Sequence, residues 1–574
     1  MLILGINNMH DASAALIYDG HVVAAAEEER FNRIKHTTGF PLNAISYCLK
    51  EANITIKDID FIAVGWKYWV LKTRVLQALR SLVYSPLALR AKAERGIGQM
   101  KNEWFELFRM RKLIQNYFGK GNFRLFYIDH HLSHAASSFF VSPFDKSAIL
   151  TIDGAGEEIT TLFAVGEGER IRVLKKIKLP HSLGQFYSAI TSFLGFKVQS
   201  DEYKVMGLAA YGEPVYYDFF KEIIKIFPEG EFKLSIKILD YHLARKGIFS
   251  RRLIEVIGPP RKKGEPIEKR HADIAASAQK MIEEVLLHLT SYLYDLTKIK
   301  NLCMAGGVAL NSVANGKVFL FSPFERIFIQ PASSDAGTSL GAALYLYHLL
   351  KGKRKSYIMN HAYLGPRFSQ KECEETVAAY GLKYEVFNRE EICKIAAEAL
   401  SKGKLVFWFQ GRMEWGPRAL GNRSLLADPR KKQIKEIINK KVKKREEFRP
   451  FAPSILEEDF EEYFGINGSF PFMLFTFNVV SEKRALIPAV VHVDGTARPQ
   501  TVSKKTNPYF WKLINYFKEI TGVPVVLNTS FNVKEPIVCT PKDAINTFLK
   551  TDVDFLALEN VWVKNPKKGG TICP

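Results

Sequence analysis

The segment DHHLSHAA contains the residues of this chain that are best suited to bind a metal ion. His130 and His134 are four positions apart, so on a helix both imidazoles project from the same face. The apolar run 125–128 precedes them and predicts a strand that leads into this helix. Asp153 in TIDGAGE and Asp335 in SSDAGTS each follow an apolar run and stand among small residues. Two neutral imidazoles and two carboxylates suit a divalent transition metal with one or two open positions. Two ordinary histidines on a partly exposed helix are the alternative.

A weak internal repeat of three strands indicates how these residues are positioned. The predicted strands are 2–6, 12–18 and 22–26 in the first copy, and 148–153, 160–165 and 171–177 in the second. The copies lie about 145 residues apart and helical segments follow each. This pattern suggests the duplicated α/β fold of the actin-like ATPases (the ASKHA fold), in which the first hairpin of each half presents backbone N–H groups to phosphate.

A glycine pair after a third apolar run fits the same fold. Gly306 and Gly307 follow a predicted strand and precede a predicted helix, where the backbone can approach a nucleotide closely. Together with Gly154 and Asn311 they are the nucleotide-binding candidates of the N-terminal part. A tight turn is the alternative for the pair.

The chain divides into two predicted domains, residues 1–355 and 356–574. The charged stretch 351–356 ends the first, and 361–369 is predicted to be a linker. The second domain is predicted to be α/β or α+β. Its predicted elements are a helix over 390–402 and strands over 405–409, 472–480 and 523–527.

The second domain is dense in arginines separated by glycines and prolines. Guanidinium groups bind phosphate or carboxylate bidentately, and hydroxyl and amide groups can satisfy the remaining oxygens. The motifs therefore suggest an oligophosphate pocket; solvated loop arginines are the alternative. The motifs are Gly411-Arg412, the stretch 416–424, Lys443, and the stretches 449–453, 498–500 and 528–532.

Composition predicts a cytoplasmic globular protein. The 574 residues are 47% hydrophobic, with no apolar run of membrane-spanning length and no secretory signal. The six cysteines are scattered and expected to be reduced. Much of the net charge of +21 is local, because 67–124 holds 13 Lys and Arg against 3 Asp and Glu. This basic insertion reads as one or two amphipathic helices, with either a solvated face or an anionic partner.

Long, ordered motifs make the chain similar to a known family over nearly its full length. It resembles the O-carbamoyltransferases of the NodU/CmcH type, which act in antibiotic and nodulation-factor biosynthesis. The motifs are HDASAAL, EEERFNRIKH, HHLSHAAS, DGAGE, KVMGLAAYG, GGVALN, SSDAG, GPRALGNRS, VKKREEFRPFAP and LNTSFN.

The resemblance implies two active sites. A YrdC-like C-terminal domain would use carbamoyl phosphate and ATP, with Mg, to form carbamoyl adenylate. The residues that would hold these substrates are Arg418, Lys443, Arg449, Arg498, Asn528 and Ser530. The N-terminal domain, similar to tRNA threonylcarbamoyltransferases, would transfer the carbamoyl group to a hydroxyl of a small-molecule or glycan acceptor. His130, His134, Asp153 and Asp335 would hold the metal, for which iron is the family expectation and manganese or zinc are alternatives.

Three further residues are candidates for acceptor binding or proton removal. His10 and Asp11 lie at the turn of the first hairpin, and Lys35 lies in the EEERFNRIKH segment. The chain departs from the family at two places. Tyr203 stands where a glycine is usual, and the loop over 531–538 is one residue short, which puts the role of Lys534 in doubt.

Two other function classes are alternatives to a carbamoyltransferase. A metal-dependent ATPase or kinase of the actin-like superfamily would not explain the arginine-rich second domain. A tRNA-modifying protein would agree with the net charge of +21, but the sequence has no RNP or KH signature, so nucleic acid is not an expected partner. The sequence does not identify the acceptor. It leaves open a homodimer, and also contact of the basic insertion with a membrane or an anionic acceptor.

Overall fold

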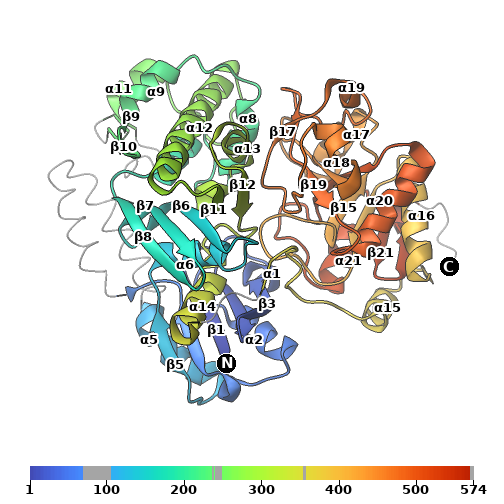
Figure 1. Cartoon of the computed structure of the whole chain (residues 1–574). Coiled ribbons are helices and arrows are strands. Elements are labelled where there is room, and N and C mark those ends of the chain that lie inside the picture. Colours follow the sequence, from blue (N-terminus) through green and yellow to red (C-terminus); the bar gives the residue numbers. More distant parts are fainter. Residues whose placement is uncertain (69–104, 236–237, 240–248, 353–356, 569–574) are drawn as a thin grey trace. The chain divides into compact units, whose positions relative to one another are not determined.

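The computed structural model describes residues 1–68, 105–235, 238–239, 249–352 and 357–568 (Figure 1). The chain forms two compact units. The first comprises Met1–Glu28 and His36–Met359, and the second comprises Glu29–Lys35 and Asn360–Pro574. Most of the basic insertion, residues 69–104, lies outside the described residues, so its predicted role does too. Within the described part, no helix is long and apolar enough to cross a bilayer.

The first unit contains two five-stranded sheets of the same topology. The strand orders are β3-β2-β1-β4-β5 and β12-β11-β6-β7-β8. In each sheet the first three strands form an antiparallel meander, and the two remaining strands run parallel to the meander's first strand. The predicted duplication of a three-stranded α/β unit is therefore confirmed.

The central strands of both sheets are largely buried, whereas β5 and β8 are more exposed. They are β1 (Leu2–Asn7), β2 (Ser13–Tyr18), β3 (His21–Glu27), β4 (Phe61–Val64) and β5 (Arg124–Tyr127), then β6 (Lys146–Gly156), β7 (Ile159–Glu167), β8 (Arg170–Lys178), β11 (Asn301–Ala305) and β12 (Arg326–Ile329). A separate hairpin comprises β9 (Ile224–Phe227) and β10 (Glu231–Leu234).

Helices cover these sheets (Figure 1). They are α2 (Leu42–Glu51), η1 (Ile56–Asp58), α5 (Phe105–Phe118), α6 (His130–Phe139), α7 (Leu183–Phe193), α8 (Glu202–Ala209), α9 (Tyr217–Ile223), α11 (Arg251–Ile257), α12 (Lys269–Thr297), η4 (Gly307–Leu310), α13 (Ser312–Phe321) and α14 (Ala336–Lys351). The departure at Tyr203 falls in α8, where that side chain is exposed.

Helix α14 packs against α6, β1 and β2 at very short range. A Cβ at Gly341 would lie 1.7 Å from the carbonyl oxygen of Ser133 in α6. A Cβ at Gly5 in β1 would lie 1.8 Å from the carbonyl oxygen of Ser339. Both contacts are with backbone, which cannot swing aside as a side chain can, so these two positions require glycine.

The second unit is built on an eight-stranded mixed sheet of order β13-β22-β21-β14-β15-β20-β16-β19. Its strands are β13 (Tyr384–Val386), β14 (Val406–Phe409), β15 (Arg423–Ala427), β16 (Ala452–Leu456), β19 (Gln500–Val502), β20 (Val525–Ser530), β21 (Phe555–Leu558) and β22 (Val561–Lys564). A small pair comprises β17 (Phe477–Asn478) and β18 (Thr496–Ala497). The α/β class is therefore confirmed for this part as well.

The helices of the second unit include one short segment from the start of the chain. That segment contains α1 (Glu29–Asn32). The others are α15 (Gln370–Ala379), α16 (Arg389–Ser401), α17 (Gln433–Ile437), the π-helix η5 (Ile438–Lys443), η6 (Glu457–Asp459), α18 (Phe460–Phe464), α19 (Ser481–Arg484), α20 (Pro508–Thr521), α21 (Pro541–Leu549) and η7 (Pro566–Lys568).

Two predictions about the second domain were wrong in detail. The predicted strand 472–480 contains only the two-residue β17, because its phenylalanines pack as an aromatic cluster with Phe460 and Phe470 rather than alternating across a sheet. The predicted linker 361–369 is part of the packed unit. Its backbone is hydrogen-bonded to Met413 and Trp415 through Ala362, Gly365 and Pro366.

The contact between α14 and α6 generates a stability prediction. Gly341→Ala should lower the free energy of unfolding by about 3 kcal/mol or more, because the added methyl group must push two buried backbones apart. Gly352→Asn is the matched control, since Gly352 ends α14 in a left-handed conformation with open space around it, and Asn tolerates that conformation. Urea unfolding measures both variants. Equal stability of Gly341→Ala and wild type would contradict the packing described.

Candidate active site

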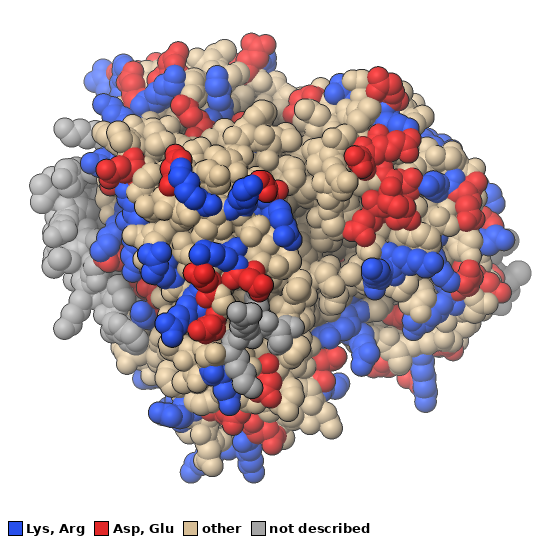
Figure 2. Space-filling model, viewed as in Figure 1, with Lys and Arg blue, Asp and Glu red and all other residues tan. Residues whose placement is uncertain are grey.

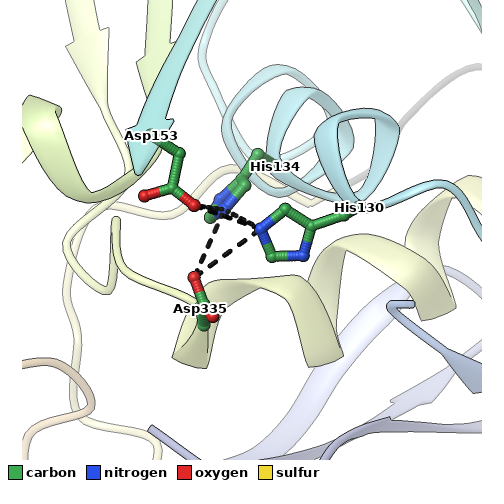
Figure 3. Close-up of side chains that lie close together, drawn as sticks. All are labelled: His130, His134, Asp153 and Asp335. Atoms are coloured by element: carbon green, nitrogen blue, oxygen red, sulfur yellow. Dashed lines mark hydrogen bonds and ion pairs between the residues drawn. The ribbon is translucent and has the colours of Figure 1, made fainter. Parts of the chain in front are cut away.

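Four side chains from three elements meet in the first unit (Figure 3). His130 and His134 project from α6, Asp153 stands in β6, and Asp335 is the N-cap of α14. One ligand atom from each residue can be chosen so that all four atoms lie within 4.8 Å of one another. These are the four residues predicted from the sequence as metal ligands.

The distances show that both imidazoles and both carboxylates face a common centre. His130 Nε2 lies 3.1 Å from His134 Nε2, 3.2 Å from Asp153 Oδ2 and 3.6 Å from Asp335 Oδ1. His134 Nε2 lies 3.7 Å and 3.9 Å from the same carboxylate oxygens. These nitrogen and oxygen atoms form a donor set that fits a divalent transition metal.

Burial and the neighbouring charges shift the pKa values of these residues. Burial would lower the pKa of His130, but Asp335 and Asp153 outweigh it and raise that pKa to about 9. Burial and the charge of Asp153 raise the pKa of Asp335 to about 7. Burial opposes ionisation of Asp153 too, but hydrogen bonding to His130 and His134 holds its pKa well below the usual range.

Neighbouring residues fix the orientation of the ligands. Asp153 accepts a hydrogen bond from the Gly307 amide through Oδ1 at 3.1 Å, which leaves Oδ2 for the histidines. A Cβ at Gly156 would lie 2.3 Å from the His130 ring, so the second glycine of DGAGE makes room for that ring. Glu157 is buried and accepts from the His130 amide at 3.2 Å.

The third histidine of the motif has a different role. His131 Nδ1 lies 2.7 Å from Thr151 Oγ1, and its Nε2 lies 2.9 Å from the Ile159 carbonyl oxygen. Both ring nitrogens are therefore engaged within the protein. Burial and the two neighbouring histidines lower its pKa well below the usual value. His131 joins α6 to the second sheet and faces no open coordination site.

A second cluster of titratable residues lies near the first. Asp11 Oδ1 lies 2.8 Å from His36 Nδ1 and 3.4 Å from His10 Nδ1, and the two imidazoles stack with centroids 5.2 Å apart. Burial would lower the pKa of His10, but Asp11, with smaller contributions from Asp335 and Asp153, raises it to about 10. The sequence analysis proposed His10 and Asp11 but missed His36, which ends the quoted EEERFNRIKH motif.

Three of the four nucleotide-binding candidates lie beside the proposed metal ligands. Gly154 follows Asp153, and Gly306 and Gly307 follow β11. Gly306 has a φ of +95°, and a Cβ there would meet the Ile152 carbonyl oxygen at 2.2 Å. Asn311 instead caps α13 and exchanges hydrogen bonds with Gln279, which also accepts from the Tyr187 hydroxyl.

The second unit contains a cluster of cations. Burial, with the charges of Arg418 and Arg445, lowers the pKa of Arg498 well below its usual value, and its buried Nε has no hydrogen-bond partner among the described residues. Guanidinium groups stay charged in proteins. Three arginines this close therefore favour an anionic ligand between them. Arg445 and Lys435 were not among the sequence candidates, although both lie in a basic run of the sequence.

A second part of this basic region surrounds Lys443. Its ammonium group is buried and donates to the backbone oxygen and hydroxyl of Ser530 and to both oxygens of Asn532. Burial and the neighbouring Arg445, Arg449 and Lys35 lower its pKa well below the usual value. The shortened loop after Ser530 is held by this lysine. Lys534 is exposed.

Lys35 belongs to this basic region and not to the His10 cluster. The segment Glu29–Lys35 is part of the second unit, where Arg30 donates to the Gly416 carbonyl and Arg33 to the Ile537 carbonyl. Burial first, and then Arg30 and Arg449, lower the pKa of Lys35. The candidate that the sequence grouped with His10 is thus placed with Arg449 and Lys443.

Asn528 lies in β20 of the same unit. Its side-chain amide donates to Ser454 Oγ at 3.0 Å and Gln500 Oε1 at 3.1 Å, and its buried Oδ1 has no partner among the described residues. Arg423, by contrast, is fully buried and donates to the carbonyls of Gln410, Gly411 and Pro366. Arg423 supports the loop and is not available to a ligand.

On the face shown in Figure 2, basic and acidic side chains are interspersed among the described residues. The net charge of +21 is therefore not gathered into one broad basic surface on that face. The pattern differs from the continuous basic stripe that nucleic-acid binding favours.

Comparison with known proteins decides the family. A model described as carbamoyltransferase N-terminus matches residues 2–344, and one described as carbamoyltransferase C-terminus matches residues 397–565. The chain belongs to the carbamoyltransferase family. It is a transferase enzyme, and the similarity to the nodulation carbamoyltransferases stated from the motifs is confirmed.

The relatives extend over almost the whole chain. Nodulation protein NolNO of Sinorhizobium fredii is 42% identical over 564 residues, which cover 97% of this chain and 79% of that protein. An uncharacterized protein of Synechocystis, sll1178, is 41% identical over 97% of this chain and 96% of its own length. Nodulation protein U of Rhizobium tropici is 28% identical over 93% of this chain and 91% of its own length.

Solved structures give a weaker likeness. HypF of T. kodakarensis has a TM-score of 0.32 at 16% identity, covering 61% of this chain and 48% of that protein. Component A of the Acidaminococcus fermentans (R)-2-hydroxyglutaryl-CoA dehydratase has a TM-score of 0.31 at 18% identity, covering 60% and 98%. At these scores neither likeness supports a conclusion about function.

The cluster on α6 generates a metal-binding prediction. Purified wild-type enzyme should carry on the order of one Fe, Mn or Zn ion per chain, because two imidazoles and two carboxylates converge. His134→Ala should lose most of this metal, as one of four donors is removed. His131→Asn is the matched control on the same helix and should keep its metal, although it loses hydrogen bonds. Elemental analysis after gel filtration measures both. Full metal content in His134→Ala would show that the site is misassigned.

Proposed function

We propose that this carbamoyltransferase works in two steps at two sites. In the second unit, ATP and carbamoyl phosphate would give carbamoyl adenylate. In the first unit, the carbamoyl group would pass to a hydroxyl of a small-molecule or glycan acceptor. The observation that carries the proposal is the separation of the two kinds of charge. A His/Asp cluster suited to a metal lies in one unit, and a cluster of buried cations suited to phosphates lies in the other.

In the first step the second unit would hold two phosphorylated substrates. Arg418, Arg445 and Arg498 would neutralise phosphate oxygens by charge-assisted hydrogen bonds. Lys443, Arg449 and Lys35 would hold the remaining charge, and Ser530 and Asn528 would offer polar groups to the carbamoyl part. This eight-stranded unit is proposed to be a YrdC-like carbamoyl-adenylate-forming domain. Mg would accompany ATP.

In the second step the first unit would act on a mixed anhydride with AMP as its leaving group. His130, His134, Asp153 and Asp335 would hold a divalent metal, proposed to be Fe(II), that supplies Lewis-acid stabilisation. Gly154, Gly306 and Gly307 would present backbone to the nucleotide, and Asn311 would support this region by capping α13. His10 would bind the acceptor hydroxyl as a hydrogen-bond donor, because Asp11 outweighs burial and raises the pKa of His10 to about 10, and His36 holds Asp11 in place.

The acceptor class rests on the relatives named as nodulation proteins and on the transfer chemistry. A hydroxyl group is the nucleophile that an O-carbamoyltransferase requires. No contact in the described residues selects one acceptor over another, so the proposal names the class alone.

The proposal predicts that the half-reactions separate. Arg498→Ala should reduce carbamoyl-phosphate-dependent pyrophosphate release from ATP by about 100-fold or more, because a buried cation is lost from the phosphate site. The same variant should still transfer the carbamoyl group from carbamoyl adenylate supplied ready-made. Arg389→Ala, an exposed arginine outside this cluster, is the control and should behave as wild type. Loss of both half-reactions in Arg498→Ala would contradict separate sites.

The placement of Lys35 gives a second test of the same division. Lys35→Ala should slow pyrophosphate release about tenfold and raise the KM for carbamoyl phosphate or ATP, because one cation near Lys443 and Arg449 is removed. Transfer from supplied carbamoyl adenylate should continue at the wild-type rate. Normal pyrophosphate release with impaired transfer would contradict this assignment and would indicate that Lys35 acts in the transfer step.

A further inference from the structure

His492 lies in the loop before β18 and has a defined tautomer. Its Nδ1 is 3.1 Å from Thr496 Oγ1, and the Thr496 hydroxyl donates to Asp494 Oδ1 at 2.7 Å. A threonine hydroxyl has a single hydrogen. Because Thr496 gives that hydrogen to Asp494, its oxygen accepts a hydrogen bond from His492 Nδ1–H. The hydrogen-bond network therefore leaves the lone pair of the ring on Nε2.

The free nitrogen of His492 is accessible. Nε2 has no hydrogen-bond partner among the described residues, and it is not one of their buried unsatisfied atoms, so it reaches solvent. The backbone holds the ring in place, since the His492 amide donates to the Thr496 carbonyl at 2.7 Å. His492 is thus a positioned base with one nitrogen open to a ligand or a water molecule.

The surroundings of the ring are those of the proposed phosphate site. Burial lowers the pKa of His492 to about 4, and Arg498 and Lys435 contribute to this shift against the charge of Asp494. Arg498 in turn is influenced by Arg418 and Arg445. The imidazole is therefore neutral near pH 7 and stands among the cations that would hold phosphate.

Two other carboxylates of the second unit accept hydrogen bonds from loop backbone. Glu414 Oε1 accepts from the backbone amides of Leu420, Asn422 and Arg423. Glu535 accepts from the amides of Val533 and Lys534. Both carboxylates organise loops, although Glu414 Oε2 is itself buried without a hydrogen-bond partner among the described residues.

The chemistry of the proposed first step requires such a base. Carbamoyl adenylate, pyrophosphate and phosphate together contain one oxygen and two hydrogens more than carbamoyl phosphate and ATP. One water molecule must therefore be consumed. Its attack on carbamoyl phosphate would release carbamate, which can then displace pyrophosphate from the α-phosphorus of ATP.

We propose that His492 is the general base for this water in the adenylate-forming site. Its Nε2 takes one proton from the water as the oxygen bonds to the phosphorus of carbamoyl phosphate. The bond from phosphorus to the bridging oxygen breaks, and carbamate leaves with the electron pair. The second hydrogen of the water stays on inorganic phosphate, and the imidazolium gives its proton to solvent. This inference rests on the proposed function of the second unit.

The arrival of the substrate makes the proton transfer favourable. In the empty site the neighbouring cations disfavour an imidazolium. A bound phosphate dianion offsets the charges of Arg498 and Lys435, so the pKa of His492 rises toward the working pH, where a general base is most effective. The base is thus activated by the substrate that it serves.

A bypass experiment tests the role of His492 in the full-length enzyme. His492→Gln should reduce carbamoyl-phosphate-dependent pyrophosphate release by about 100-fold or more. With ammonium carbamate in place of carbamoyl phosphate, the same variant should release pyrophosphate from ATP at a rate close to wild type, because no water has to be activated. His361→Gln, a second histidine of this unit, is the control and should be active with both donors.

The possible results distinguish failure of the role of His492 from failure of the proposed adenylate-forming function. Loss of both reactions in His492→Gln would overturn the inference, since it would indicate a role in binding or folding. Wild-type activity with carbamoyl phosphate would overturn it as well. If wild-type enzyme itself releases no pyrophosphate with either donor, the proposed function fails first.

Two further measurements probe the details. Thr496→Val removes the acceptor for Nδ1–H, so it should slow the carbamoyl phosphate reaction about tenfold and shift its pH profile, with the carbamate reaction unchanged. In ¹⁸O-labelled water, the label should appear in inorganic phosphate. Label in the carbamoyl group instead would overturn attack at phosphorus.

Discussion

The short contact of α14 with α6 and β1 is the constraint on which the first unit depends. At Gly341 and Gly5 the backbone of α14 and the backbone of its neighbours are in direct contact. A residue with a Cβ at either position would force them apart. Asp335 at the start of α14 is thereby brought to within 3.6 Å of His130 Nε2. The packing of α14 therefore helps to set the geometry of the His/Asp cluster.

Both proposed sites store unfavourable charge that a ligand would relieve. Two carboxylates meet at the His130 cluster, where burial raises the pKa of Asp335 to about 7. In the second unit, the charges of Arg418 and Arg445 act on Arg498, and those of Arg445 and Arg449 act on the buried Lys443. Like charges of this kind oppose folding in the empty protein. A cation in the first unit and phosphates in the second would each remove the repulsion, which explains why such costly arrangements lie at functional sites.

The segment Glu29–Lys35 shows how one short stretch can serve a distant part of the chain. It follows β3 in sequence, yet its arginines donate to carbonyls of Gly416, Pro536 and Ile537 in the second unit. His36, the next residue, pairs with Asp11 in the first unit. Adjacent residues of one motif thus belong to different clusters, and a motif's continuity in sequence does not mean that its residues act together.

The sequence by itself determined the repeat, the meanders and the residue types of the His/Asp cluster. Local periodicity and the Asp-Gly turn specify β1 to β3, and the spacing of His130 and His134 specifies one face of α6, because these features depend on near neighbours alone. Tertiary structure decided the rest. It distinguished His131 from its neighbours, placed Lys35 with Lys443, and set Arg445, Lys435 and His492 beside Arg498. Which buried side chains are already hydrogen-bonded, and which charges lie together, depends on contacts between residues far apart in the chain, and these do not follow from local pattern.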